Sequence, residues 1–288
     1  MRKGLVISGG GARGLFTIQI LRRMLADKFD FSEIKAISGG SVGSIIGAMI
    51  AQGDINLVIE LFDNIRNKDV YKGKLSLARV AWALATGKNY ILDIEPLYAT
   101  LSKYISLQKA LSGIPFSFGL VDMATGAYRT FYPQDFYTNE DYIRAIMASC
   151  SQEVIWQPQS FRTKTETIQY GADGGIVTVS PIGAVISNEI DQIIIINNTP
   201  SHIGYTSKLN NLGLVAMRML DILLNSSFNK DLDKFVERNA AALAGDKRYL
   251  YVPSFRYQTT LQDDGLDFDT EEVRKARIKD ANMVYSWK

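Results

Sequence analysis

The sequence predicts an α/β fold, a three-layer α/β/α arrangement around a central, mostly parallel sheet. Short apolar runs alternate with longer segments of helical periodicity, which is typical of a sheet covered by helices. The chain also opens with a strand, a helix, a strand and a helix, at 5–8, 12–28, 34–38 and 42–51. Of its 288 residues 47% are hydrophobic and 22% charged, the composition of an ordinary globular protein. We therefore expect one domain over 1–288.

The later elements follow from the same patterns. Four consecutive isoleucines within 190–197 suit a strand buried on both faces. Two β-like runs, 116–122 and 127–132, are joined by Met-Ala-Thr-Gly, which predicts a hairpin. The other predicted helices span 56–67, 76–86, 95–104, 139–149, 208–228, 230–244 and 270–284, and the other strands 166–171 and 248–254.

Charge and cysteine content exclude several classes of function. Thirty-two basic residues against 30 acidic ones give a net charge of +2, so the total gives no reason to expect a nucleic-acid partner. Cys150 is the single cysteine and cannot form an intramolecular disulfide. No cluster of cysteine and histidine predicts a zinc site. We expect neither a metal nor a cofactor, and the sequence leaves the oligomeric state open.

The apolar segments bear on localisation. Only Leu5, Val6 and Ile7 precede the first glycines, which is too short an apolar run for a signal peptide. No stretch approaches the roughly 18 uninterrupted apolar residues of a membrane span. The prediction is a cytoplasmic or peripheral membrane protein without a signal peptide or transmembrane segment.

The first glycine-rich loop admits two interpretations. Gly9, Gly11 and Gly14 spell G-x-G-x-x-G between a predicted strand and helix, as in a dinucleotide-binding turn. Such a turn is followed about 20 residues later by an acidic residue at the end of the second strand. Here that strand ends in Ser38-Gly39, and no carboxylate stands there. The sequence therefore disfavours a dinucleotide.

A second motif favours nucleophilic catalysis. The segment Gly39-Gly40-Ser41-Val42-Gly43 has the form G-x-S-x-G and lies between a strand and a helix. In a nucleophile elbow, small residues around the serine permit a sharp turn that exposes its hydroxyl at a helix N-terminus. Alone the pattern is weak, and an accidental glycine-rich turn is the alternative. The strand-to-helix context favours Ser41 as a nucleophile.

The two motifs explain each other. Loops at the same edge of adjacent parallel strands converge, so the amides of Gly9, Gly10 and Gly11 are expected to face Ser41 and receive the oxyanion formed when it attacks a carbonyl. Glycine lets the backbone approach closely. The alternative for this loop is a tight turn with close helix packing.

The general base is not expected to be a histidine. The only one, His202, follows the isoleucine strand, where an exposed loop position is the simpler interpretation. Asp173 is the better candidate, because Gly171, Gly174 and Gly175 around it permit close approach to a serine, and partial burial would raise its pKa. The alternative is an aspartate that stabilises its own turn.

Three blocks together resemble the patatin-like phospholipase family: Gly-Gly-Gly-Ala-Arg-Gly at 9–14, Gly-Gly-Ser-Val-Gly at 39–43 and Asp-Gly-Gly at 173–175. The resemblance covers roughly residues 4–200. Residues 147–158 are also similar to a segment of this family, although Gln152, Glu153 and Trp156 depart from its commonest form.

The resemblance implies a patatin-like fold and a serine–aspartate dyad without a metal, in which Ser41 is the nucleophile, Asp173 the base and Gly9 to Gly11 the oxyanion hole. It implies hydrolysis of phospholipids or lysophospholipids through an acyl-enzyme. Supporting roles fall to Arg13, as the motif arginine that orders the loop, supports anion binding or forms a structural pair, and to Gly14, Gly39, Gly43 and Gly174.

Two segments lie outside these motifs. Residues 206–288 carry no family motif, and we expect helices and a strand packed on a core of about 4–205, with the charged C-terminal helix as ordinary surface or as a docking site for an activating protein. Residues 66–90 carry six cationic residues against one acidic residue, with three aromatic residues among them, namely Arg66, Lys68, Lys72, Lys74, Arg79, Lys88, Asp69, Tyr71, Trp82 and Tyr90. This segment is expected either to face a phospholipid surface or to be an amphipathic helix pair with a solvated basic face.

Three functions remain open at this stage. A lipid acyl hydrolase is favoured. The same nucleophile and oxyanion hole would serve an esterase, thioesterase or acyltransferase that acts on soluble acyl groups. The third is a catalytically silent binding protein.

Overall fold

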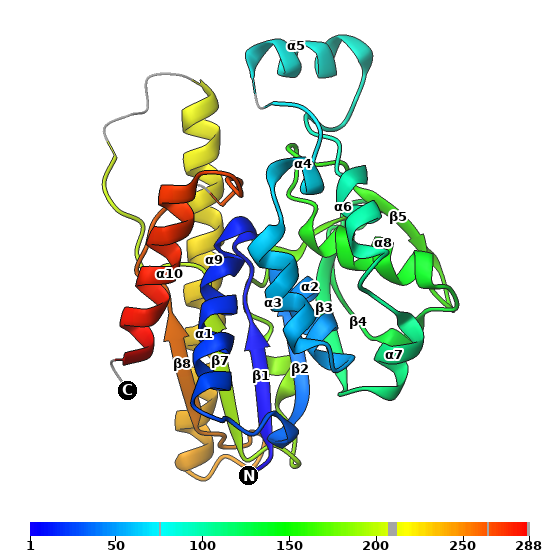
Figure 1. Ribbon diagram of the computed structural model, residues 1–288. Helices are drawn as coiled ribbons and strands as arrows, with labels where there is room; N and C mark the ends of the chain where they lie inside the picture. Colours follow the sequence, from blue (N-terminus) through cyan, green and yellow to red (C-terminus); the bar gives the residue numbers. More distant parts are fainter. Residues whose placement is uncertain (75, 207–211, 264, 287–288) are drawn as a thin grey trace.

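A computed structural model describes residues 1–74, 76–206, 212–263 and 265–286 (Figure 1). Its centre is an eight-stranded sheet in the order β5-β6-β3-β2-β1-β7-β8, with β4 paired to β3. The strands are β1 (Lys3–Ile7), β2 (Ile34–Gly40), β3 (Phe116–Asp122), β4 (Ala127–Phe131), β5 (Gln159–Arg162), β6 (Thr167–Asp173), β7 (Gln192–Asn197) and β8 (Ser254–Gln258).

The sheet has a parallel part and an antiparallel end. The pairs β1–β2, β1–β7, β2–β3 and β7–β8 are parallel, whereas β3–β4, β3–β6 and β5–β6 are antiparallel. The α/β class with a central, mostly parallel sheet is therefore confirmed, and so is the hairpin of β3 and β4.

Helices cover both faces of the sheet. The α-helices are α1 (Gly14–Ala26), α2 (Val42–Ala51), α3 (Ile55–Asn64), α4 (Asn67–Val70), α5 (Leu77–Thr86), α6 (Glu95–Leu101), α7 (Leu107–Ser112), α8 (Asn139–Cys150), α9 (Leu212–Leu243) and α10 (Glu271–Ser286). Helices α1, α2, α3, α8 and α10 pack together on one face, and α9 packs on the other with two short 3₁₀ turns, Gly174–Ile176 and Ile182–Val185 (Figure 1).

The alternation of side chains along each central strand produces two hydrophobic cores. In β7, Ile194 and Ile196 belong to the larger core under α1 and α2, whereas Ile193 and Ile195 belong to the smaller core under α9. All four are at most 5% exposed. The prediction of a strand buried on both faces is confirmed.

One long helix replaces two predicted ones. Helix α9 is continuous over Leu212–Leu243, whereas the sequence predicted a break near residue 229. Phe228 and Phe235, seven positions and two turns apart, are both buried and hold the two halves on one line. Asn229 satisfies its amide on Ser201 O and Asn225 Oδ1, so the polar residue does not end the helix. Positions 208–211 of the predicted helix lie outside the described residues.

Other element boundaries also differ. The last strand begins at Ser254, although the sequence predicted it over 248–254. Pro253 has no amide hydrogen for a ladder, and its carbonyl accepts from Ile193 N at 2.9 Å just before the strand begins. The short elements α4, α7 and β5 were not predicted, because four to six residues carry too little periodicity.

The antiparallel end brings two strand termini together. Strand β4 occupies one edge of β3 over Phe118–Asp122, so β2 and β6 share the other edge. Along that edge Gly40, the last residue of β2, lies opposite Gly119, and Asp173, the last residue of β6, lies opposite Leu120. The two strands therefore end beside each other.

No helix in the described part of the chain combines the length and the apolar character that crossing a bilayer requires.

Candidate active site

Ser41 joins β2 to α2 in a strained conformation. Its backbone has φ 50° and ψ −127°, and positive φ is uncommon for a residue with a Cβ. Such strain persists only where the surrounding structure enforces it, and it concentrates at functional sites. The hydroxyl stands at the N-terminus of α2, as the elbow motif predicts.

Two glycines make this turn possible by close backbone approach. A Cβ on Gly43 would lie 2.1 Å from Ile7 O, and one on Gly39 would lie 2.3 Å from Gly43 O. Real Cβ atoms cannot occupy such positions, so both places require glycine. Helix α2 therefore starts directly against the end of β1.

Ser149 holds the backbone of the turn. Its Oγ accepts the amide hydrogen of Ser41 at 3.1 Å and donates to Gly119 O at 2.6 Å. It also lies 2.7 Å from Ser44 Oγ. This residue is fully buried in α8. The family resemblance points to residues 147–158, but no local sequence pattern reveals that Ser149 contacts a residue 108 positions away.

Asp173 reaches the neighbourhood of Ser41 from β6, which runs antiparallel to β3. The aspartate ends β6 and is 7% exposed. Burial is the largest influence on the pKa of the carboxyl and raises it to about 6. The nearby Ser41 side chain and the Gly175 amide, which donates to Oδ1 at 2.8 Å, act in the opposite direction. Gly174 follows in a 3₁₀ turn.

The glycine loop lies beside Ser41. A Cβ on Gly9 would lie 3.1 Å from Ser41 Cβ. Gly10 and Gly11 have φ 148° and 55°. The amide of Gly9 donates to Val179 O at 3.2 Å, whereas among the described residues no partner engages the amides of Gly10 and Gly11. The sequence predicted that the Gly9 amide would receive the oxyanion, but this amide already donates to Val179 O.

The C-terminal part of the chain holds this loop in place. Ala12 N donates to Gly265 O at 2.6 Å. Arg13, just before α1 begins at Gly14, donates from Nε to Asp263 Oδ1 at 2.9 Å. Arg277 of α10 binds the other oxygen of Asp263 at 2.6 Å and Ala12 O at 3.1 Å. Of the roles open to Arg13, the geometry shows structural pairing.

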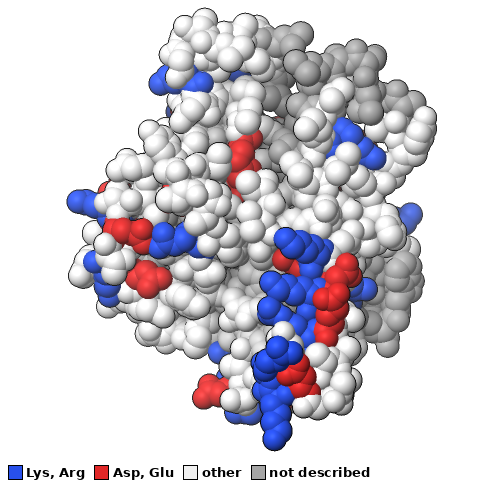
Figure 2. Space-filling view, turned by 180° about the vertical axis from the view of Figure 1, so that it is seen from behind, with Lys and Arg blue, Asp and Glu red and all other residues white. Residues whose placement is uncertain are grey.

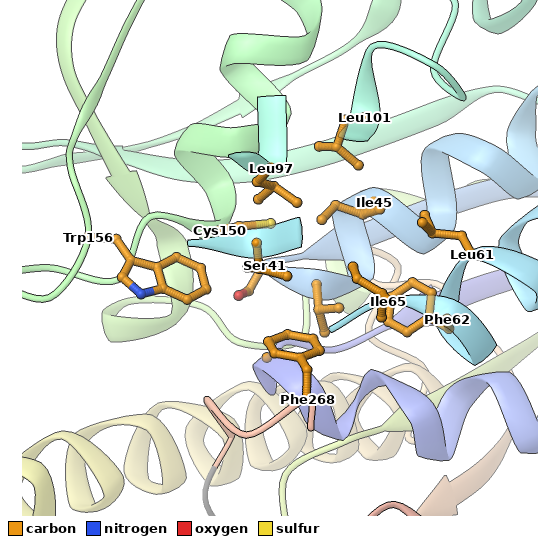
Figure 3. A pocket seen from close by; sticks show the side chains of 13 residues that line it. Ser41, Ile45, Leu61, Phe62, Ile65, Leu97, Leu101, Cys150, Trp156 and Phe268 are labelled. Carbon is orange, nitrogen blue, oxygen red and sulfur yellow. The ribbon is translucent and has the colours of Figure 1, made fainter. Parts of the chain in front are cut away.

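Two cavities meet at Ser41. The larger, of about 530 Å³, has the polar side chains of Arg13, Arg218 and Gln262 in its lining beside Asp173. The smaller, of about 30 Å³, is apolar and lies among α2, α3, α4 and α6. Figure 3 shows Ser41 at one end of this pocket, between Trp156 and Phe268, with Leu61 toward the far end.

Glu153 is a second carboxyl group in the larger cavity. Its Oε1 is buried and has no hydrogen-bond partner within the described structure. Burial, and next the charge of Asp173, raise the pKa of Glu153 to about 8. In the sequence, the only sign of a special role for Glu153 is that this position departs from the commonest form of the family's segment.

The only histidine lies away from the site, whereas the only cysteine lies beside it. His202 is exposed and does not line either cavity. Cys150 is buried and lines both. Within the described ranges, no group of three or more histidine, cysteine, aspartate or glutamate residues is arranged to hold a metal ion.

The fold and the site define an α/β protein with a serine and an aspartate beside each other, at the carboxyl ends of two neighbouring strands of its sheet. The chain belongs to the patatin-like phospholipase family, whose model matches residues 5–186.

Comparison with known proteins gives two similar sequences and one similar structure. The chain is 28% identical over 193 residues to a cGAMP-activated phospholipase of Escherichia coli strain TW11681, covering 62% of this chain and 52% of that protein. It is 26% identical over 200 residues to one of Vibrio cholerae serotype O1, covering 62% and 54%. The chain thus spans about half the length of these curated relatives. The crystal structure of VipD from Legionella pneumophila aligns with 99% of this chain and 67% of its own at 14% identity and a TM-score of 0.45.

Proposed function

We propose that the chain is a lipid acyl hydrolase that cleaves carboxylic ester bonds of phospholipids or lysophospholipids. One observation carries the proposal: a serine at a strained turn and a buried aspartate line the same cavity, beside two glycine-loop amides that no described residue engages. A nucleophile, a base and an anion site are the three parts that acyl transfer requires.

In the proposed reaction Asp173 accepts the hydroxyl proton while Ser41 Oγ forms a bond with the ester carbonyl carbon. The tetrahedral intermediate collapses, and the departing alcohol oxygen takes the proton from Asp173. Water then gives its proton to Asp173 and attacks the acyl-enzyme, which releases the fatty acid and restores Ser41. Burial favours this role, because a raised pKa makes the carboxylate a stronger base than a solvated one.

We assign the oxyanion to the amides of Gly10 and Gly11 and to the amide of Val42 at the start of α2. Gly9, whose amide donates to Val179 O, brings the loop against Ser41 instead. The positive end of α2 adds to the stabilisation of negative charge at this position.

The two cavities support a lipid substrate. The apolar walls of the pocket beside Ser41 suit the first carbons of an acyl chain, and the larger cavity, with the polar side chains in its lining, suits a glycerol and headgroup. Two relatives are named phospholipases, which supports the same substrate class. An activating partner remains a proposal for this chain.

Lipid mass spectrometry of phospholipid vesicles incubated with purified protein tests the proposal. We expect fatty acid release by the wild type and a loss of at least about a thousandfold in Ser41→Ala and Asp173→Asn. A fluorophosphonate should label the wild type and not Ser41→Ala.

Ser102→Ala is the matched control, because Ser102 is exposed directly after α6, where its hydroxyl donates to Tyr98 O. Full activity of Ser41→Ala would refute the assignment. Turnover of a short-chain soluble ester without turnover of vesicles would favour the soluble acyl substrate.

A further inference from the structure

Residues 71–74 and 76–91 belong to an arm that leaves the body of the protein and returns to the same place. At its base Lys72 N donates to Asp93 O at 2.7 Å, and Asp93 N donates to Lys72 O at 3.3 Å. The amides of Ile91 and Leu92 both donate to Ile155 O, at 3.1 and 2.7 Å. The arm is thereby anchored to the segment that carries Glu153 and Trp156.

The end of the arm is helix α5, which stands apart from the other elements (Figure 1). Ser76 caps its N-terminus and Gly87 ends it in the left-handed conformation, so the helix has a defined start and stop. Of its ten residues, Arg79 alone is charged. Ala83 is buried, but Trp82 is 37% and Leu84 80% exposed. A helix this apolar and this exposed indicates an interaction surface.

The charge of the arm is of one sign. Between Val70 and Leu92 the sequence has four cationic residues and no acidic one, whereas the whole chain has a net charge of only +2. Lys72, Lys74 and Lys88 are exposed, and Arg79 stacks on Trp82 with 4.1 Å between guanidinium and ring centroid. Figure 2 shows blue groups without red at the end that carries the arm, whereas red and blue mix over the lower half.

A second apolar surface lies across the mouth of the larger cavity. The first turns of α9 expose Val215, Met219, Ile222 and Leu223, between 37% and 59% each. Leu224 and Arg218 of the same turns line the cavity that holds Ser41. On the other side, a groove of about 370 Å³ beneath α5 reaches Glu153, which lines both spaces. Both apolar surfaces therefore border the entrance to the site.

We propose that this end of the molecule docks on an anionic lipid bilayer, with Trp82 and Leu84 of α5 entering the interface and the arm's lysines contacting phosphates of the headgroups. Aromatic and cationic side chains around an apolar helix match the chemistry of that interface. A second copy of this chain fits this surface less well, because two arms in contact would bring four cationic residues of one copy against four of the other. The inference rests on the proposed function for the identity of the substrate, since docking would present ester bonds to the cavity.

Vesicle flotation with Ser41→Ala protein tests docking without turnover. Binding is compared between phosphatidylcholine vesicles and vesicles that also contain phosphatidylserine. We expect the anionic vesicles to bind more tightly. Replacing Lys72, Lys74 and Lys88 by glutamine should weaken that binding about a hundredfold, at roughly fivefold per cation. Trp82→Ser with Leu84→Ser should weaken binding to both kinds of vesicle.

The matched control replaces Lys28, Lys35 and Lys247 by glutamine. These three lysines are exposed at the opposite end of the molecule, where the strands begin. It should bind like the parent. The proposal would be overturned if the control lost as much vesicle binding as the arm variants, or if the arm variants bound vesicles fully. It would also be overturned if the parent protein were a dimer and the arm substitutions made it a monomer. Fluorophosphonate labelling of the arm variants in the Ser41 background must remain normal. A failure of labelling in the wild type would instead refute the proposed function.

Discussion

At the residue scale, the buried carboxyl groups of Asp173 and Glu153 have different environments. Burial raises both pKa values, but the Ser41 side chain and the Gly175 amide hold that of Asp173 at about 6, whereas the charge of Asp173 raises that of Glu153 further, to about 8. Asp173 is therefore the carboxylate at neutral pH, and Glu153 keeps its proton. Because both pKa values exceed those of the unfolded chain, each group lowers the stability of the fold as pH rises through its titration.

This difference predicts a bell-shaped pH dependence. On a soluble ester, kcat/KM should rise through about pH 6 as Asp173 ionises. It should fall above about pH 8, because an ionised Glu153 adds a second negative charge near the forming oxyanion. Glu153→Gln should keep the acidic limb and lose the alkaline one.

Initial rates across about pH 5 to 10 measure both limbs. An alkaline limb that survives in Glu153→Gln would show that Glu153 does not cause it. Glu189→Gln, an exposed position before β7, serves as the control and should retain the wild-type profile.

At the element scale, the site depends on how closely α2 approaches the end of β1. A Cβ on Gly43 would meet Ile7 O at 2.1 Å and Ser8 O at 2.9 Å, both rigid backbone atoms. The helix would have to move away from the strand, and Ser41, next to its first residue, would move with it. The packing of α2 against the end of β1 therefore determines the position of Ser41.

Gly43→Ala is expected to lower the free energy of unfolding by about 3 kcal/mol and to slow fluorophosphonate labelling at least about a hundredfold. Urea unfolding and labelling rates measure the two effects. Gly183→Ala is the control, because nothing lies within 4 Å of its added Cβ. It should change stability by less than about 0.5 kcal/mol. Normal labelling of Gly43→Ala would show that the approach does not position Ser41.

At the scale of the whole molecule, the C-terminal third completes the site of the family domain. The family match ends at residue 186, yet Asp263 and Gly265 bind the glycine loop near the N-terminus. Arg277, 2% exposed in α10, joins that contact to the helix that packs on α1. A buried guanidinium that binds a carboxylate and a carbonyl together fixes geometry that a single ammonium cannot reproduce.

Arg277→Lys should therefore reduce kcat/KM about tenfold, through displacement of Gly10 and Gly11. Lys275→Arg is the control on the same helix, because Lys275 is exposed and pairs with Glu271, away from the loop. It should retain both stability and activity. Equal activity losses would indicate a general structural role.

The sequence by itself determined the fold class and the family, because its signals are local. Alternating apolar runs predict the sheet and helices, and the glycines around Ser41 predict the sharp turn, since each pattern reflects conformations of neighbouring residues. The long α9 escaped prediction because the packing of Phe228 and Phe235, not local propensity, keeps it continuous.

Only the tertiary structure decided which distant groups meet at Ser41. Asp173 arrives there because β2 and β6 end beside each other on one edge of β3. Ser149 and Asp263 bind the turn and the glycine loop across 108 and 250 residues of sequence. Contacts between residues so far apart follow from strand order and helix packing, which impose no periodicity on the residues that make them.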